Sequence, residues 1–132
     1  MLINTALLCL SLNLYHEARG EENNTAAQIA VAEVTLNRVA SPHYPNSVCG
    51  VVKQYKQFSW FWDDRSDKPY EKEAFKKSLS IAERMLAERD HYSVVGRKAT
   101  HYHASYVKPY WAKKFKKIKT VGKHVFYSAE KK

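Results

Sequence analysis

The sequence predicts one mainly helical α+β domain, and three observations support this. The 132 residues are enough to bury a single hydrophobic core, and 45% of them are apolar. Gly and Pro each occur only four times, and they fall between segments of helical periodicity rather than within them. Beyond Gly96 the pattern changes to short alternating runs that favour strands. We therefore expect helices joined by short loops, followed by a small C-terminal β hairpin.

The first helix is expected over the apolar run from Leu7 to Leu14. This run is well short of the ~20 residues that a membrane-spanning helix needs. No Lys or Arg precedes Arg19 and no small-residue cleavage pattern is present, so we read the run as part of the mature protein and not as a signal peptide. Gly20 is suited to ending the helix, because glycine readily adopts left-handed backbone angles.

The second helix is expected over 26–40, which is apolar on nearly every side and should run through the core. Thr25 and Gln28 have the spacing of a capping box at its start. Glu33 and Asn37 lie one turn apart within it. The favoured interpretation is a solvated stripe, and the alternative is a hydrogen-bond network that reaches toward the end of the first helix.

The middle of the chain combines a loop, an aromatic segment and a long helix. Residues 41–46 should form a loop because each proline disfavours helix at the residue before it, and 47–52 a short helix or turn. Residues 54–62 interleave aromatic and amide side chains, which suits a sugar ring and a plain core about equally well. The longest helix should begin near Asp67 and Pro69, end around 89–91, and act as an amphipathic support.

The C-terminal third should carry the sheet. Residues 99–103 alternate as a short strand does, and Pro109 and Trp111 follow in a turn-like segment. Residues 119–121 and 124–127 flank Gly122-Lys123, which can form a two-residue hairpin turn. The lysines between Lys113 and Lys119 are then expected on one exposed surface.

Positive charge is concentrated in the same third of the chain. Of the net charge of +9, residues 97–132 contribute eleven Lys and Arg against one acid, Glu130, whereas residues 1–96 hold eleven against twelve. Such a surface attracts anionic polymers. The two cysteines, Cys9 and Cys49, have neither a metal-binding spacing nor the density of a disulfide framework, so buried free thiols are the favoured prediction.

Segment 15–21 holds the strongest candidate for a catalytic group, Glu17. A carboxyl group at the mouth of an apolar helix can keep its proton to higher pH, because burial disfavours the charged form, and a general acid needs that proton. The alternative is a structural glutamate that is solvated or paired with Arg19. The local pattern alone favours this alternative.

Other kinds of site find little support. His16-Glu17 begins like the zinc-protease signature, but Gly20 stands where the second histidine is required. His101 and His103 share one face of the expected strand, yet no Cys or nearby carboxylate completes a metal site, so we expect no metal and no cofactor. No phosphate-binding glycine loop or nucleophile elbow is present.

A second carboxylate, which glycosidases usually need, is also hard to assign. Glu21 lies beyond the expected helix break at Gly20, and Asp63 and Asp64 are too distant in sequence to be placed. Cys49 has no evident base partner, which argues against a cysteine nucleophile.

These residues together resemble the SleB-type cell wall hydrolases, a family named for a spore cortex-lytic enzyme. The resemblance covers nearly the whole chain, and the combination of its blocks is more specific than any one of them. One departure is His16, which stands where the family more often has glycine. The matching blocks are residues 15–21, 28–39, 44–52, 57–60, 100–104, 106–109, 111 and 122–127.

The resemblance implies a lysozyme-like fold that cleaves the peptidoglycan glycan strand between N-acetylmuramic acid and N-acetylglucosamine. Glu17 matches the family's catalytic acid. In members that are lytic transglycosylases this one glutamate protonates the glycosidic oxygen and then helps the sugar's own 6-hydroxyl attack, which gives 1,6-anhydro products without a second carboxylate. Candidates for the substrate groove are Gln57, Ser59, Trp60, Thr100, His101, Tyr102 and His103.

Two rival functions stay open at this stage. One is a hydrolysing muramidase that uses a second carboxylate, and the other is a non-enzymatic basic module that binds nucleic acid or wall polymer. A single catalytic domain over 1–132, with no separate wall-binding domain and no export signal, is similar to phage endolysins. We therefore expect a monomer without a transmembrane segment and without a nucleic-acid partner. It would wait in the host cytoplasm until lysis and then act at the cell wall or periplasm, where anionic envelope polymers attract its basic C-terminal third.

Overall fold

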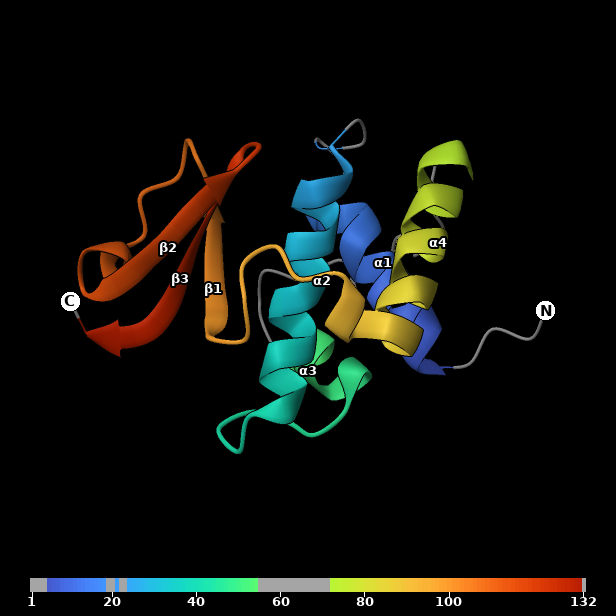
Figure 1. Cartoon of the computed structure of the whole chain (residues 1–132), viewed down its shortest axis with the longest axis horizontal. Coiled ribbons are helices and arrows are strands. Elements are labelled where there is room, and N and C mark those ends of the chain that lie inside the picture. Colours follow the sequence, from blue (N-terminus) through green and yellow to red (C-terminus); the bar gives the residue numbers. More distant parts are fainter. Residues whose placement is uncertain (1–4, 19–20, 22–23, 55–71, 132) are drawn as a thin grey trace.

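The computed structural model describes residues 5–18, 21, 24–54 and 72–131, and in this part of the chain helices precede a small sheet. Figure 1 shows the helices at one side of the molecule and the three strands at the other. The predicted fold class, mainly helical α+β, is therefore confirmed.

The helices form the larger layer. They are α1 (Thr5–Glu17), α2 (Thr25–Ala40), α3 (Val48–Gln54) and α4 (Lys72–Glu88), and the 3-10 turn η3 (Arg89–His91) follows α4 directly. α1 packs against α2, α3 and α4, so it lies at the centre of this layer. Within the described residues no helix combines the length and the apolar character that a membrane crossing requires.

The burial of each helix follows from its sequence pattern. α1 and α2 are apolar on most sides, and residues around their whole circumference are buried, among them Leu10 and Tyr15 of α1. α4 is amphipathic and buries only Ser78, Ile81, Ala82 and Met85. This confirms the predicted support helix, although its expected start near Asp67 and Pro69 lies outside the described residues.

The start of α2 differs from the predicted capping box. Asn24, one residue earlier than expected, is the N-cap, and its side-chain oxygen accepts a hydrogen bond from the Ala27 amide at 3.0 Å. Gln28 does not fold back onto Thr25. Its side-chain nitrogen donates to the Glu21 carbonyl at 2.9 Å, so it ties the helix to the chain entering it.

The predicted solvated stripe on α2 is wrong, because Glu33 and Asn37 are both buried. The Glu33 carboxylate accepts hydrogen bonds from the Ser93 hydroxyl and from the amides of Val94 and Val95, at 2.8 to 2.9 Å. Asn37 donates to the carbonyls of Gly96 and Ala99, both at 2.8 Å. The network exists, but it fixes the loop before the sheet instead of reaching the end of α1.

Glu33→Ala should therefore lower the free energy of unfolding by about 3 kcal/mol, because the buried Val95 amide, the half-buried Val94 amide and a hydroxyl would lose their acceptor. Urea unfolding followed by circular dichroism measures this change. The matched control is Glu83→Ala on the exposed side of α4, which should change stability by less than about 0.5 kcal/mol. Equal effects of the two substitutions would contradict the role given to Glu33.

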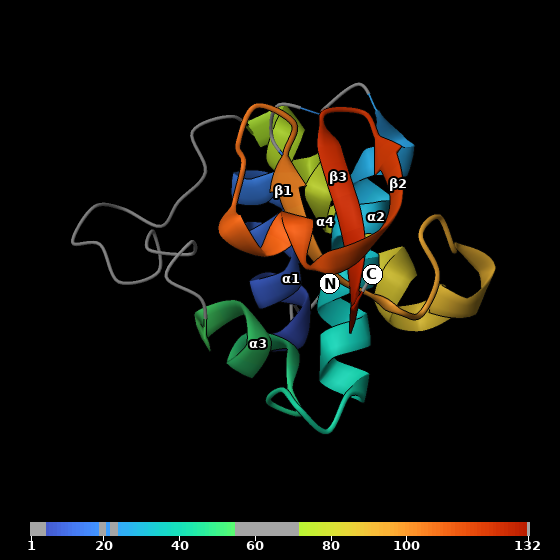
Figure 2. The same ribbon diagram turned by 90° about the vertical axis from the view of Figure 1, so that its left-hand side faces the viewer.

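The sheet contains β1 (Ala99–Ala104), β2 (Phe115–Val121) and β3 (His124–Lys131) in the order β1-β3-β2, with both pairings antiparallel. The 3-10 turn η4 (Tyr110–Lys113) precedes β2. Gly122-Lys123 connects β2 to β3, as predicted, and Gly122 has a φ of +58°. Figure 2 shows the sheet from its broad side, with the strands in front of the helices, so one face of the sheet packs on α2 and the other faces outward.

The prediction of free thiols is wrong, because Cys9 and Cys49 form a disulfide. Cys9 lies in α1 and Cys49 in α3, and packing of these two helices brings the Cα atoms to 5.3 Å from each other. The sequence separation of 40 residues spans the whole of α2. Local pattern does not reveal such a pairing, since it depends on how α1 and α3 pack against each other.

Candidate active site

Glu17 is the last residue of α1, and its carboxylate faces the sheet. Its Oε1 atom accepts a hydrogen bond of 2.9 Å from the hydroxyl of Tyr102, which lies in the middle of β1. The buried face of the sheet supports this tyrosine, because its ring contacts those of His124 and Phe126 on the neighbouring strand. The helix layer and the sheet thus meet at one carboxyl group.

Burial raises the pKa of Glu17 from 4.5 to about 7, and the hydrogen bond from Tyr102 and the positive charge of Arg38 act in the opposite direction. This is the shift expected for a carboxyl group at the mouth of an apolar helix. Near neutral pH both protonation states are populated. The same group is therefore able to donate a proton and to accept one.

Arg38 is a site residue that the sequence did not single out. It is buried in α2, and its Nε atom donates to the carbonyl of Thr100 at 2.6 Å. Its guanidinium also lies 5.2 Å from the centre of the Tyr44 ring. A cation in a helix that is expected to run through the core is the signal that could have identified it, because such a charge is rarely buried without a purpose.

A pocket of about 200 Å³ opens beside Glu17. Glu17 and Glu21 line it from the helix side, and the sheet, its hairpin turn and the loop after β1 close the other side. The remaining lining residues are His16, Ala104, Tyr106, Lys123 and His124. The pocket therefore holds two carboxylates, two imidazoles and one lysine.

The sequence predicts a helix break before Glu21, which argues against Glu21 as a second carboxylate beside Glu17. α1 does end at Glu17, yet Glu21 returns to the same pocket. Its Oε2 atom accepts a hydrogen bond from the Lys123 amide at 2.6 Å and lies 3.1 Å from Nδ1 of the His124 ring. One oxygen of this carboxylate is thus committed to holding the β2–β3 turn against the helices.

The four candidate residues of β1 do not all face Glu17. Only Tyr102 contacts it. His101 and His103 are on the outer face of the sheet, where their rings pack on Trp111. Thr100 lies at an irregularity in the strand pairing, with its hydroxyl 3.0 Å from Nδ1 of His101. Burial and the nearby Arg38 lower the pKa of His101 to about 4, so its imidazole is neutral at neutral pH.

The other groove candidates lie in the part of the chain that the structure does not describe. Gln57, Ser59 and Trp60 lie outside the described residues, as do Arg19, Gly20 and the two aspartates Asp63 and Asp64. The groove roles of Gln57, Ser59 and Trp60 stay predictions. Among residues 5–18, 21, 24–54 and 72–131, no three His, Cys, Asp or Glu side chains are grouped so that they could hold a metal ion.

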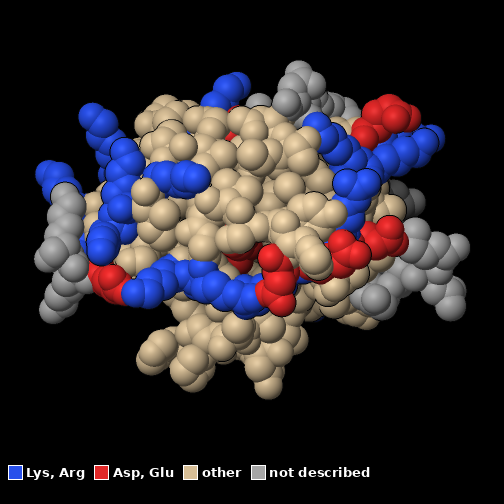
Figure 3. Space-filling view, viewed as in Figure 1, with Lys and Arg blue, Asp and Glu red and all other residues tan. Residues whose placement is uncertain are grey.

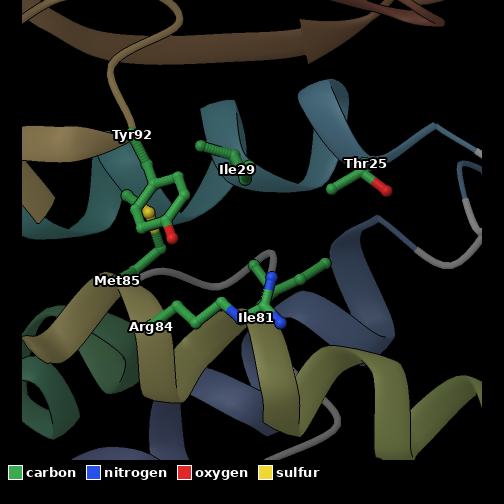
Figure 4. Close-up of a pocket in the computed structure, with 6 residues that line it drawn as sticks. All are labelled: Thr25, Ile29, Ile81, Arg84, Met85 and Tyr92. Carbon is green, nitrogen blue, oxygen red and sulfur yellow. The ribbon is translucent and has the colours of Figure 1, made fainter. Parts of the chain in front are cut away.

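A separate small hollow lies between α2 and α4 and is shown in Figure 4. Its volume of about 20 Å³ has room for a water molecule but not for a sugar. Ile29, Ile81 and Met85 form most of its apolar wall, and none of the described residues that line it has a carboxylate. It is a packing defect of the helix layer and not a competitor for the candidate site.

Comparison with known families gives a match over most of the chain. A family model described as Cell Wall Hydrolase matches residues 22–127. The spore cortex-lytic enzyme of Bacillus cereus is 29% identical over 113 residues, which are 86% of this chain and 40% of that protein. The spore cortex-lytic enzyme of Bacillus subtilis is 47% identical over 49 residues, or 37% of this chain and 15% of that protein. The chain thus spans less than half the length of these relatives.

Two solved structures have similar folds. The catalytic domain of the germination-specific lytic transglycosylase SleB from Bacillus anthracis superposes with a TM-score of 0.70 at 27% identity, over 93% of each chain. The catalytic domain of the Bacillus cereus SleB protein gives a TM-score of 0.67 at 28% identity, over 95% of this chain and 91% of that one. The similarity therefore extends over both the helix layer and the sheet.

Proposed function

Because this chain belongs to the Cell Wall Hydrolase family, we propose that it is a peptidoglycan lytic transglycosylase with Glu17 as both acid and base. The proposed substrate is the glycan strand, cleaved between N-acetylmuramic acid and N-acetylglucosamine. The solved SleB domain of Bacillus anthracis, which is described as a lytic transglycosylase, supports this reaction type.

The proposed reaction uses one carboxyl group twice. Protonated Glu17 gives its proton to the glycosidic oxygen as the bond from that oxygen to C1 of the muramic acid breaks, which releases the 4-hydroxyl of N-acetylglucosamine. The carboxylate that remains then removes the proton of the 6-hydroxyl on the same muramic acid, and O6 bonds to C1. Glu17 ends protonated, a 1,6-anhydro sugar is formed, and no water is consumed.

The observation that carries this proposal is the burial of Glu17 at the junction of helix layer and sheet. Its pKa of about 7 is suited to a group that must hold a proton in one step and release it in the other. Tyr102 fixes one carboxylate oxygen, which leaves the other available to the pocket. Arg38 keeps the ionised form accessible through its positive charge.

Mass spectrometry of digested, purified peptidoglycan tests the proposal. Products should carry 1,6-anhydro-muramic acid. Reducing-end products without anhydro sugars would instead support a hydrolysing muramidase, for which Glu21 is the carboxylate in the same pocket. We favour transglycosylation because the Lys123 amide and the His124 ring already engage one oxygen of Glu21. If the protein released no glycan at all, the result would support a non-enzymatic binding module.

Tyr102→Phe is expected to lower the rate about tenfold and to move the alkaline limb of the pH profile upward. The hydroxyl that orients the carboxylate would be lost, and the hydrogen bond that lowers the pKa of Glu17 would be lost with it, so the pKa should rise above its value of about 7. Initial rates measured between pH 5 and 9 would show both effects, and Tyr92→Phe on the loop after α4 is the control. An alkaline limb that stays in place would contradict the contact between Tyr102 and Glu17.

We also propose that the basic C-terminal third holds the enzyme on anionic polymers of the cell envelope. Lys113, Lys114, Lys116, Lys117 and Lys119 are all exposed, as expected from the sequence. In Figure 3 blue side chains gather at the left end of the molecule, over the sheet. Surface charges of this kind are screened by salt, since the Debye length falls from about 10 Å at 0.1 M to about 3 Å at 1 M.

Lysis of cell walls should accordingly fall at least about fivefold between 0.05 and 0.5 M salt, because binding to the anionic wall weakens. Turbidity loss of a wall suspension measures this rate. Turnover of a short, uncharged glycan fragment is the control and should change less than about twofold. A lysis rate that is indifferent to salt would remove the electrostatic part of the proposal.

A role as an endolysin is the final part of the proposal. The enzyme would be held in the host cytoplasm as a monomer until the membrane is opened, and would then act at the wall or periplasm. The Cys9–Cys49 disulfide is consistent with action at the wall or periplasm, because disulfides persist in oxidising compartments. Cytoplasmic expression in a bacterium tests this, since lysis should begin only after the membrane is permeabilised.

A further inference from the structure

A second pocket lies on the outer face of the sheet, away from Glu17. Its volume is about 580 Å³, against about 200 Å³ for the pocket beside Glu17. His103 and Tyr127 form its floor, on neighbouring strands, and the chain between β1 and β2 forms its wall. Figure 2 shows this connecting segment, in orange, in front of the sheet and on the side opposite the helices. A pocket of this volume is in the usual range for a ligand site.

Exposed aromatic and basic side chains line this outer pocket. Tyr110 has 80% of its surface exposed and Val107 has 43%, and the Nζ atom of Lys114 lies 5.7 Å from the centre of the Tyr110 ring. Lys108 and Lys113 line the same hollow, and none of the described residues that line it is acidic. A tyrosine ring beside two ammonium groups offers a stacking surface and two positions for anions.

An ordered ring cluster supports the floor and wall. Nε2 of His103 lies 2.9 Å from the Tyr127 hydroxyl, and the two rings are stacked. The Trp111 ring packs edge-on against both of these rings, at 5.7 and 5.2 Å between centroids. The floor of the pocket is therefore preformed, which lowers the entropic cost of binding a ligand there.

The outer pocket and the pocket beside Glu17 share one short loop. Tyr106 lines the pocket beside Glu17, whereas its neighbours Ser105 and Val107 line the outer one. The loop is fixed at both ends, because the Ser105 amide donates to the Lys123 carbonyl at 2.8 Å and the Val107 amide to the Ala104 carbonyl at 2.9 Å. A polymer bound at one pocket is therefore brought close to the other.

We propose that the outer pocket is a second, non-catalytic site for a peptidoglycan glycan strand. A sugar ring would stack on Tyr110, and Lys108 and Lys113 would pair with the carboxylates of the peptides attached to the strand. Two observations support this ligand. None of the described lining residues is acidic, so no negative charge repels the carboxylates of the peptides, and the loop shared with the pocket beside Glu17 brings the same polymer close to both pockets. The proposal rests on the function proposed above, because it takes the same polymer as its ligand.

Binding to insoluble peptidoglycan tests the proposal when cleavage is prevented. Every protein carries Glu17→Gln, and the probe is sacculi from which teichoic acids have been removed. Tyr110→Ala should weaken co-sedimentation at least about fivefold, which corresponds to one stacked ring, and Lys108→Ala/Lys113→Ala should weaken it by a similar factor. The charge-matched control is Lys72→Ala/Lys76→Ala on exposed positions of α4, which should bind within about twofold of the parent.

Binding by Tyr110→Ala and by the double lysine variant at the strength of the parent would overturn the proposal. A loss seen only with walls that retain teichoic acid would also overturn it, and would assign the pocket to a phosphodiester polymer. Because Tyr110 is largely exposed, its substitution should leave the melting temperature unchanged. Cleavage products are measured separately on the unmodified protein, so failure of the reaction and failure of the second site are distinguishable.

Discussion

Glu17→Gln is expected to abolish cleavage of peptidoglycan, with a loss of at least about 10³-fold, while the protein stays folded. The amide has almost the shape of the carboxyl group and its oxygen still accepts the Tyr102 hydrogen bond, but it has no proton to give to the glycosidic oxygen. Turbidity loss of a wall suspension and release of anhydro-muropeptides both measure the effect. Undiminished cleavage by this variant would remove Glu17 from the reaction.

The same substitution should make the protein more stable at alkaline pH. The pKa of Glu17 is about 7 in the folded protein and 4.5 in the unfolded chain, so the folded state binds the proton more tightly. The stability that this proton provides is fully present below pH 4.5 and is lost as the pH rises through 7. Above that range the ionised carboxylate costs roughly 3 kcal/mol, which the neutral amide avoids.

Thermal unfolding at pH 4 and pH 8 separates this effect from other consequences of the substitution. Glu17→Gln should melt at nearly the same temperature as the parent at pH 4 and several degrees higher at pH 8. Glu83→Gln, on the exposed side of α4, should change neither value. A variant that is destabilised at both pH values would show that the carboxylate has a structural role instead.

Gly122→Ala should give the second large effect, a loss of about 3 kcal/mol in the free energy of unfolding. A Cβ at this position would collide with Oε2 of Glu21 and approach the side-chain nitrogen (Nδ2) of Asn24 to 2.8 Å. Glu21 cannot easily move away, because that same oxygen accepts the Lys123 amide and meets the His124 ring. The positive φ of +58° adds backbone strain for any residue with a side chain.

Gly96→Ala is the matched control, because Gly96 also has a positive φ, +84°, but its added Cβ would meet nothing within 4 Å. It should cost only the backbone strain, about 1 kcal/mol. Urea denaturation of the two variants measures the difference, which is the cost of separating the hairpin turn from Glu21. Equal losses would mean that the close approach at Gly122 contributes nothing.

The fold class could be predicted from sequence because it depends on local pattern, whereas local pattern alone favoured a solvated or paired Glu17. The apolar run before Glu17 defined a buried helix, and burial is the main cause of its raised pKa. The hairpin turn at Gly122-Lys123 could also be predicted from the sequence. In each case the deciding residues are neighbours along the chain, and propensity acts over that range.

Strand periodicity explains why the groove was only partly predictable. Thr100, His101, Tyr102 and His103 were proposed together, yet successive residues of a strand point to opposite faces. His101 and His103 share one face with Trp111, and Tyr102 is on the other with Glu17. The sequence shows the alternation but does not reveal which face the helices cover.

Contacts between distant segments were the least predictable. Glu33 looked like part of a solvated stripe because its partners, Ser93 to Val95, are about 60 residues away. Glu21 looked separated from Glu17 because Gly20 intervenes, although the hairpin holds it in the same pocket. The burial of a carboxylate can be predicted from sequence only when its hydrogen-bond donors lie close to it along the chain.

The Cys9–Cys49 disulfide has a consequence for the unfolded chain. It closes a loop with a sequence separation of 40 residues, and this loop includes Glu17, Glu21 and all of α2. In the chain-entropy description, closing a loop of this length removes about 4 kcal/mol of conformational freedom from the unfolded state. The restricted segment carries the proposed acid and Arg38, whose positive charge acts on the pKa of Glu17 from the helix side. Reduction of this disulfide would therefore give the unfolded chain more conformational freedom. The contacts within the folded active site would stay the same.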